Sequence, residues 1–262
     1  MKKSYAWVLV LFVLTLLYLP DIGHSKPVAK PEKIAVVMTN HSKYPGRPDT
    51  TGLWLTELTH FYDIARNAGY DMDFVSPNGG VVPLDQRSLG GVYMDEAARK
   101  HLEDPEFMKR LKHTKAAAEV NPSAYRAIYY TGGHGVMWDY RDNSGLKNLG
   151  ESIYRQGGII ATVCHGGAGL IDLVDENGRP LVSGRHVTGF SNMEEKLSGL
   201  KSQVPFLLED ELKARGALYR RSGLSFAPFI VTDGRIVTGQ NPGSSKAVAV
   251  AVIKILSDEQ SH

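Results

Sequence analysis

The sequence predicts an α/β fold in which a doubly wound, mostly parallel β-sheet is sandwiched between helices. Short apolar, β-branched runs, such as residues 34–38 and 159–163, have the composition of strands that are buried on both faces. Segments with helical periodicity separate these runs, and strands that alternate with helices form parallel sheets. With 262 residues, of which 42% are hydrophobic, the chain is long enough to bury one sizeable core.

The first elements are expected to form a strand–helix–strand unit. A buried strand is predicted over residues 33–39, and a loop rich in Pro, Gly and polar residues follows it. From Thr51 the pattern becomes helical, and Gly69 is well placed to end the helix. The apolar face of this helix carries Trp54, Leu58, Phe61, Ala65 and Ala68. A second strand is predicted over residues 71–76.

Residues 78–121 are too long for a plain crossover and are interpreted as an inserted segment. A loop rich in Gly and Pro opens it, and a charged helical stretch runs from about residue 95 to 119. We expect the insertion to pack near the functional site. A solvated helix pair without a role is the simpler alternative.

The remaining elements continue the alternation up to a hairpin near the C-terminus. Asp233-Gly234 gives this hairpin a strong turn signal, and Ser244 is a plausible N-cap of the last helix. The predicted elements are, in order, a strand at 127–130, a helix at 144–156, a strand at 159–163, a strand edge at 186–190, a helix from Met193, a helix at 207–215, hairpin strands at 229–232 and 235–238, and a helix at 244–256.

The N-terminus has the pattern of an export signal. Lys2 and Lys3 precede an apolar run over residues 6–19, and small residues near Ser25 suit a signal peptidase. We therefore expect residues 1–25 to be a cleaved signal peptide and residues 26–262 to be a single exported domain, periplasmic or secreted. An uncleaved membrane anchor is the alternative, although the run is shorter than the roughly 20 residues that a spanning helix needs. Membrane contact is expected only in that case.

The charge balance argues against nucleic acid as a partner. Thirty basic and twenty-eight acidic side chains leave a net charge of +2, and the Lys and Arg residues are scattered along the chain. The sequence leaves the oligomeric state open between a monomer and a homodimer.

Cys164, the only cysteine, ends the apolar strand at 159–163 and precedes a run of small residues. A strand that turns sharply into a helix holds such a side chain at the carboxyl end of the sheet, where open α/β folds place their sites. The partial positive charge of a helix N-terminus would favour the thiolate. An inert, buried cysteine is the structural alternative.

A thiol nucleophile needs a base, and the base needs an orienting carboxylate. His165 is adjacent to Cys164, but neighbouring side chains on a turn usually diverge, so a direct bond to the sulfur is not required of it. Glu194 and Glu195 are the candidate carboxylates, and a solvated first helical turn is the other interpretation of this acidic pair.

Two further features complete the candidate site. Gly132-Gly133-His134-Gly135 follows the neighbouring strand, where backbone N–H groups could receive an oxyanion. Glu57 borders the apolar face of the first helix, so its carboxyl is expected to be partly desolvated and its pKa raised towards a value useful for acid–base catalysis. An ordinary surface glutamate is the alternative.

Taken together, these motifs resemble the ThiJ/PfpI superfamily, which is class I glutamine amidotransferase-like, and within it the branch of heat-shock glyoxalase III proteins. The resemblance covers roughly residues 33–256 and is specific because the motifs keep their order over the whole domain. The motifs are Thr51-Gly52-Leu53-Trp54 with Glu57, the Gly132–Gly135 turn, Ala161-Thr162-Val163-Cys164-His165-Gly166, Val187-Thr188-Gly189-Phe190 and the segment 233–242.

The resemblance implies a flavodoxin-like fold and a cofactor-free, metal-free activity that converts methylglyoxal and water to D-lactate. It implies Cys164 as the nucleophile, His165 as its triad partner and Glu195 as the carboxylate, with Glu194 close enough to remain an alternative. It also implies Glu57 as the helix acid. The expected oxyanion donors are the N–H groups of Gly133 and His165, with His134 beside them in the substrate site. Gly167 departs from the branch, which often has Pro there.

Other functions remain open on the same residues. A holdase chaperone or a redox-sensing protein would use the fold without dicarbonyl turnover. A Cys-dependent peptidase or amidase needs only the triad. Glutamine amidotransfer is disfavoured because no His-x-Glu pair of the kind that those enzymes carry, far from the Cys, follows Cys164 in the sequence. A fold alone decides among none of these.

Overall fold

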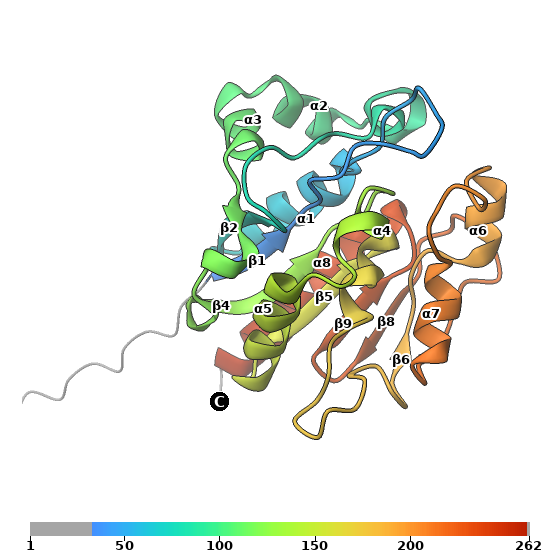
Figure 1. Cartoon of the computed structure of the whole chain (residues 1–262). Helices are drawn as coiled ribbons and strands as arrows, with labels where there is room; N and C mark the ends of the chain where they lie inside the picture. The colour runs from blue at the N-terminus through green and yellow to red at the C-terminus, as the bar shows by residue number, and fades with distance from the viewer. Residues whose placement is uncertain (1–32, 261–262) are drawn as a thin grey trace, which may run out of the picture. The chain divides into compact units, whose positions relative to one another are not determined.

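A seven-stranded sheet forms the centre of the computed structural model, which describes residues 33–260. The strand order is β3-β2-β1-β4-β5-β9-β8, and every neighbouring pair is parallel except β8 and β9. The strands are β1 (Lys33–Val37), β2 (Asp71–Ser76), β3 (Lys115–Ala116), β4 (Tyr125–Tyr130), β5 (Ile159–Val163), β8 (Ile230–Asp233) and β9 (Ile236–Gly239). The predicted α/β class and mostly parallel sheet are confirmed (Figure 1).

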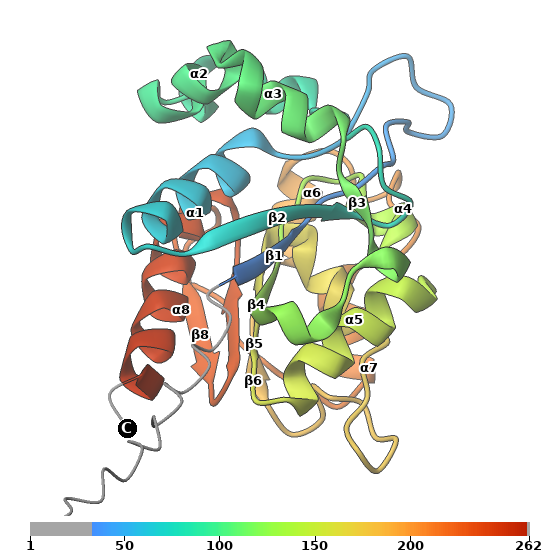
Figure 2. The ribbon, with the colours of Figure 1, turned by 90° about the vertical axis from the view of Figure 1, so that its left-hand side faces the viewer.

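Helices cover both faces of the sheet. The helices α1 (Leu55–Asn67) and α8 (Ser245–Gln260) pack together on one face, and α5 (Ser144–Arg155) packs against β4 and β5 on the other (Figure 2). The amphipathic pattern of α1 explains its orientation, because Leu58, Phe61 and Ala65 are fully buried. Phe61 stacks on Tyr129 of β4 with ring centroids 3.8 Å apart.

The insertion between β2 and β4 contains two short helices, α2 (Glu96–Glu103) and α3 (Pro105–Lys112), which lie beyond α1 (Figure 1). Asp104 caps α3, whose first residue is Pro105, so the predicted continuous helix is interrupted there. The prediction that it runs to residue 119 is wrong. The chain turns extended after α3, and β3 pairs with the end of β2.

The C-terminal third builds the other side of the site. The predicted hairpin is present as β8 and β9. The strand edge expected at 186–190 is shorter, because only β6 (His186–Val187) is extended, and it pairs with β7 (Leu218–Tyr219) outside the main sheet. The helices α6 (Asn192–Leu197) and α7 (Leu208–Ala214) lie beside this small sheet (Figure 1).

The predicted signal peptide or anchor, residues 1–25, lies outside the described residues, as does the predicted domain start at residue 26. Among residues 33–260, none of the helices combines the length and the apolar character needed to cross a membrane.

One large hydrophobic cluster of the described residues includes side chains from β1, β4, β5 and both helical layers.

Candidate active site

Cys164 occupies a sharp turn directly after β5. Its φ of 56° is in the left-handed region, which non-glycine residues rarely adopt. A tight 3₁₀ helix, Cys164–Leu170, follows in place of the expected α-helix, and all seven of its residues are buried. The turn depends on Gly166, since a Cβ there would lie 2.3 Å from the carbonyl oxygen of Tyr130.

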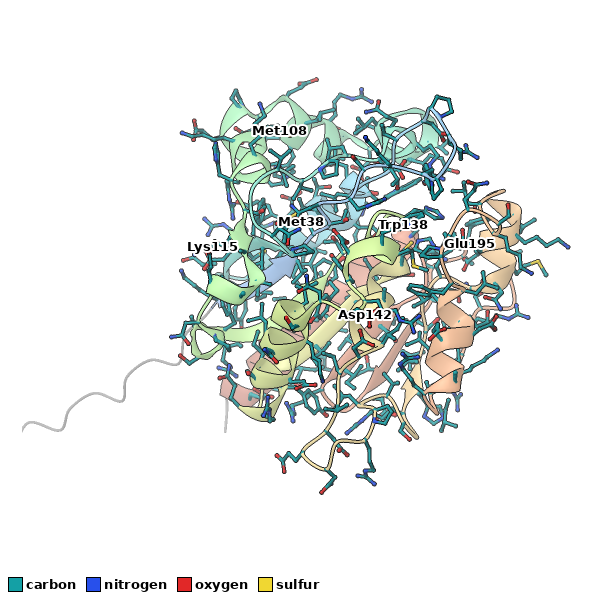
Figure 3. All side chains as sticks on the ribbon, in the orientation of Figure 1. Met38, Met108, Lys115, Trp138, Asp142 and Glu195 are labelled. Atoms are coloured by element: carbon teal, nitrogen blue, oxygen red, sulfur yellow. The ribbon has the colours of Figure 1, made fainter. Side chains whose placement is uncertain are left out.

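His165 contacts the thiol directly. Its Nδ1 lies 3.3 Å from Sγ of Cys164, so the direct contact that the sequence did not require is present, although adjacent side chains on a turn usually diverge. Its Nε2 lies 2.7 Å from Oε2 of Glu195. The three side chains form a nucleophile, base and carboxylate series, in which α6 contributes Glu195 (Figure 3).

Glu194 is occupied elsewhere. It forms a capping box with Ser191, and its Oε1 accepts hydrogen bonds from the N–H of Phe226 at 2.8 Å and from Nδ2 of Asn241 at 3.0 Å. The structure therefore places Glu195, and not Glu194, against His165.

His134 gives Glu195 a second partner. Its Nε2 lies 2.8 Å from Oε1 of Glu195, and its Nδ1 lies 3.0 Å from Nη2 of Arg87. Because a guanidinium only donates, Nδ1 is an acceptor and Nε2–H donates to the carboxylate. Burial and the charge of His165 lower the pKa of His134 to about 4, which keeps this imidazole neutral.

Arg87 was not anticipated from the sequence. It comes from the insertion, in the 3₁₀ turn Gln86–Leu89, and Asp85 fixes it through bonds of 2.9 and 2.6 Å. No helical or strand periodicity marks a loop pair of this kind. The expectation that the insertion packs near the site is confirmed.

The carboxylate of Glu195 is held ionised. Burial alone would raise its pKa, but the charge of His165 and the hydrogen bonds from both histidines outweigh burial and hold the pKa well below its ordinary value. An anion at this place stabilises a positive charge on His165.

Glu57 lies deeper than expected. It is fully buried, and Oε2 accepts a 2.6 Å hydrogen bond from the N–H of Gly132. Burial raises its pKa to about 8, and the carboxyl interacts with the Cys164 thiol. At neutral pH it is therefore mainly a neutral acid beneath the sulfur.

The Cys164 thiol is not pre-ionised in this environment. Burial raises its pKa well above the ordinary value, and a charged Glu57 would raise it further. The expected thiolate at a helix N-terminus is therefore replaced by a thiol that must pass its proton to His165.

A pocket of about 390 Å³ opens onto the sulfur. Gly133, with φ of 94°, and His165 both line it, as expected for the oxyanion donors, and no described residue accepts a hydrogen bond from the N–H of Gly133. The lining residues are Trp54, Arg87, Tyr93, Gly133, His134, Cys164, His165, Phe190, Leu197, Ser198, Phe226 and Pro242.

His134, His165 and Glu195 are also close enough to one another to be considered as metal ligands, with ligand atoms within 4.8 Å. Each oxygen of Glu195 accepts a hydrogen bond from one imidazole. An ion bound among them would have to displace both hydrogen bonds, so this arrangement fits a hydrogen-bonded acid–base series better than a metal centre.

Known proteins resemble the chain over most of its length. It is 33% identical over 237 residues to a glutathione-independent glyoxalase of Saccharomyces cerevisiae, with 87% of this chain and 99% of the relative covered. The structure of glyoxalase III from Candida albicans matches with a TM-score of 0.80 at 28% identity, covering 86% and 97% of the two chains. The 24 kDa rapid encystment protein of Francisella tularensis matches with a TM-score of 0.81 at 37% identity, covering 85% and 98%.

The family model described as DJ-1/PfpI matches residues 50–255, a range that contains every side chain of the candidate site. The resemblance inferred from the motifs is thereby confirmed, and the chain belongs to the DJ-1/PfpI family.

Proposed function

We propose that this protein is a glutathione-independent glyoxalase that converts methylglyoxal or a related 2-oxoaldehyde and water to a 2-hydroxy acid. The observation that carries the proposal is the Cys164 sulfur at a pocket, with His165 at 3.3 Å and the buried Glu57 carboxyl beside it. Relatives with the same fold carry the name of this activity.

In the first step, Sγ of Cys164 adds to the aldehyde carbon. The thiol proton passes to Nδ1 of His165, and the positive charge that forms on the imidazole faces the Glu195 carboxylate. The aldehyde oxygen becomes an oxyanion that the N–H groups of Gly133 and His165 can receive. The product is a hemithioacetal.

In the second step, a proton moves from the former aldehyde carbon to the neighbouring carbonyl carbon. The hemithioacetal hydroxyl gives up its proton as the aldehyde carbon is oxidised to a thioester. The former ketone oxygen takes up a proton as its carbon is reduced to an alcohol, so the step is an isomerisation. Glu57 is the group placed to carry the proton from one carbon to the other. Because its pKa is about 8, the ionised carboxylate that accepts the proton and the neutral carboxyl that returns it are both populated near neutral pH. Water then cleaves the thioester, releasing the hydroxy acid and the thiol.

The test is turnover of methylglyoxal by the Cys164→Ala and Cys164→Ser variants, with folding checked by circular dichroism. We expect hydroxy acid formation to fall at least about 1,000-fold in both variants, since neither side chain gives a covalent thioester. Glu57→Gln should keep a thiol that reacts with alkylating agents while turnover is lost. Turnover retained in folded Cys164→Ala would refute the assignment.

We also propose, from the pattern of residues 1–25, that the chain is exported and cleaved after Ser25. N-terminal sequencing of the protein recovered outside the cytoplasm tests this. A mature chain that begins at Lys26 supports cleavage, and an intact Met1 on membrane-associated protein supports the anchor.

A further inference from the structure

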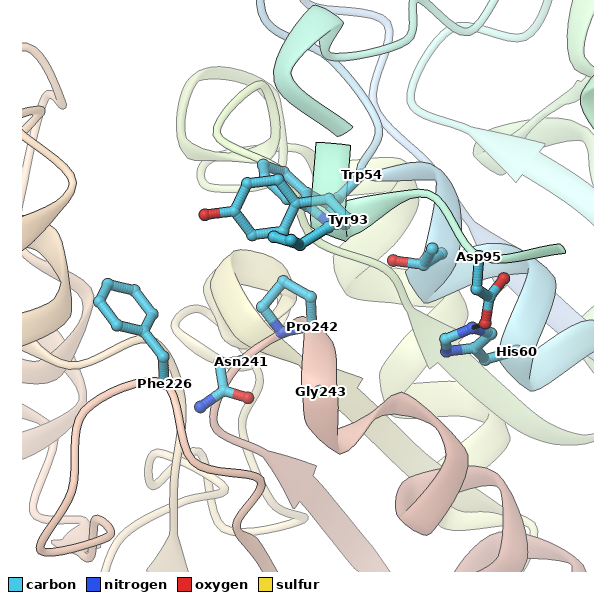
Figure 4. Close-up of a pocket in the computed structure, with 10 residues that line it drawn as sticks. Trp54, His60, Tyr93, Asp95, Phe226, Asn241, Pro242 and Gly243 are labelled. Atoms are coloured by element: carbon cyan, nitrogen blue, oxygen red, sulfur yellow. Dashed lines mark hydrogen bonds and ion pairs between the residues drawn. The ribbon is translucent and has the colours of Figure 1, made fainter. Parts of the chain in front are cut away.

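A second pocket adjoins the one that opens onto Cys164. It also has a volume of about 390 Å³, and the two pockets share four wall residues, Trp54, Tyr93, Phe226 and Pro242 (Figure 4). Ligand pockets usually measure about 300–1,000 Å³. Methylglyoxal, with three carbon atoms, would occupy a small part of the first pocket and none of the second.

The polar side of the second pocket comes from α1 and from Asp95, the N-cap of α2 in the insertion. Nε2 of His60 lies 2.6 Å from Oδ2 of Asp95, a contact drawn in Figure 4. Because the carboxylate only accepts, Nε2 of His60 is the donor in this bond. Nδ1 of His60 forms no hydrogen bond with any described residue. Thr56 lies one turn earlier on the same face of α1, is 5% exposed, and has a hydroxyl that likewise bonds to no described residue.

The other side of the pocket is aromatic. Trp54 and Tyr93 meet edge to face with centroids 5.0 Å apart, and Phe226 and Pro242 lie opposite (Figure 4). The indole N–H of Trp54 is buried and unpartnered within the described chain. The polar groups open to a ligand are the Thr56 hydroxyl and Nδ1 of His60, and a ligand hydroxyl that pairs with them gains hydrogen bonds. A chain with C–H groups on one side and hydroxyls on the other fits both walls.

We propose that this second pocket, here called the tail pocket (Trp54, Thr56, His60, Tyr93, Asp95 and Phe226), binds the hydroxylated chain of a sugar-derived 2-oxoaldehyde whose dicarbonyl end reaches Cys164. The proposal rests on the proposed glyoxalase function and names its substrate class. The reaction is unchanged: water adds, the aldehyde carbon becomes a carboxylate, and the adjacent ketone becomes an alcohol, without an external oxidant or reductant.

The first measurement compares kcat/KM for methylglyoxal with kcat/KM for the six-carbon 3-deoxyhexos-2-ulose. We expect the wild-type protein to favour the longer compound by about tenfold, and Thr56→Val to lower this ratio by about tenfold, mainly through KM, because one hydrogen bond is lost. Thr59→Val is the matched control. It removes another buried, unpartnered hydroxyl from α1, at a position that lines neither pocket.

The second measurement does not need turnover. The product-like acid 3-deoxyhexonate is titrated into the wild-type, Thr56→Val and Thr59→Val proteins, and binding is followed by calorimetry. Binding that weakens about tenfold only in Thr56→Val supports the tail pocket, even if neither dicarbonyl is consumed and the glyoxalase proposal fails. Equal binding by all three proteins overturns it.

Discussion

Glu195 accepts a hydrogen bond from His165 on Oε2 and from His134 on Oε1, and the Ser198 hydroxyl adds a longer bond of 3.3 Å to Oε1. The bonds from the two histidines hold the carboxylate in one orientation and direct the Nδ1 lone pair of His165 at the Cys164 sulfur.

The sequence pattern alone left Glu194 and Glu195 as equal candidates for this carboxylate, and only the family resemblance favoured Glu195. A local signal was nevertheless present, because Ser191 followed by Glu194 is a capping-box pattern, which turns the Glu194 side chain back to the helix start.

The second hydrogen bond to Glu195 predicts that His134 is a positioning residue. We expect His134→Ala to lower kcat for methylglyoxal about tenfold with little change in KM, because Oε1 of the buried carboxylate loses the shorter of its two hydrogen bonds. Arg87→Met should show a smaller loss, and the double variant should be no slower than His134→Ala, since both residues act through one carboxylate. Steady-state kinetics test this, with His113→Ala, at the exposed end of α3, as the control. A rise in KM with unchanged kcat would instead mean that His134 binds substrate.

The buried Glu57 carboxyl predicts a pH-dependent stability. Its pKa rises from 4.5 unfolded to about 8 folded, so the folded chain keeps a proton that the unfolded chain releases in this range. The wild-type protein should therefore lose stability as the pH rises through this window, by up to about 1.4 kcal/mol per pH unit relative to Glu57→Gln, which does not titrate. Urea unfolding of both proteins across the window measures the difference. A constant difference would show that Glu57 stays ionised.

At the scale of elements, the turn after β5 was predictable and its helix type was not. The apolar strand and the small residues after it indicate a sharp turn, whereas the 3₁₀ geometry depends on how closely the backbone approaches β4. Gly166 and Gly132 show this approach, because a Cβ on either would lie within 3.0 Å of backbone atoms of the neighbouring segment. The periodicity of apolar residues does not record how closely two segments far apart in the sequence approach each other, so the 3₁₀ geometry could not be predicted from it.

The turn predicts opposite outcomes for two adjacent glycines. Gly166→Ala should destabilise the protein by at least about 2 kcal/mol, because its Cβ meets a backbone oxygen that cannot move aside. Gly167→Ala is the matched control, since its Cβ would lie 3.2 Å from a flexible Leu208 methyl group. Thermal unfolding of both variants gives the answer. Equal stability of the two would mean that the strands can separate to accept a methyl group.

At the scale of the whole described chain, the order of strands and helices could be predicted because each has a local pattern. The insertion could not be placed with the same detail, since its contribution to the site is a loop. Its helix α3 and the start of its loop reach the main core through Val82, Phe107 and Leu111. The part that carries Arg87 and Tyr93 to the pocket borders a small separate cluster of Leu55, Met94 and Ala98.

This separate cluster predicts that activity and global stability can be uncoupled. Met94→Ala should lower kcat/KM several-fold and speed hydrogen exchange around Arg87, while the main unfolding transition moves little. Met72→Ala is the comparison, because Met72 is similarly buried but belongs to the main core, where such a change costs about 2–5 kcal/mol. If Met94→Ala unfolds the protein as readily as Met72→Ala, the segment around Arg87 and Met94 folds together with the sheet.

Glu194 has a consequence beyond helix capping. Phe226 stands in the left-handed region with φ of 62°, which is unfavourable for a bulky residue, and its N–H is bonded to Glu194. Phe226 lines both pockets, so Glu194 helps to position a side chain of the pocket wall, while the neighbouring Glu195 contacts His165. The two consecutive glutamates thus have different partners, because Glu195 contacts the histidine base and Glu194 holds a residue of the pocket wall. A substitution that acts through Glu194 can therefore change the substrate range without altering the reaction.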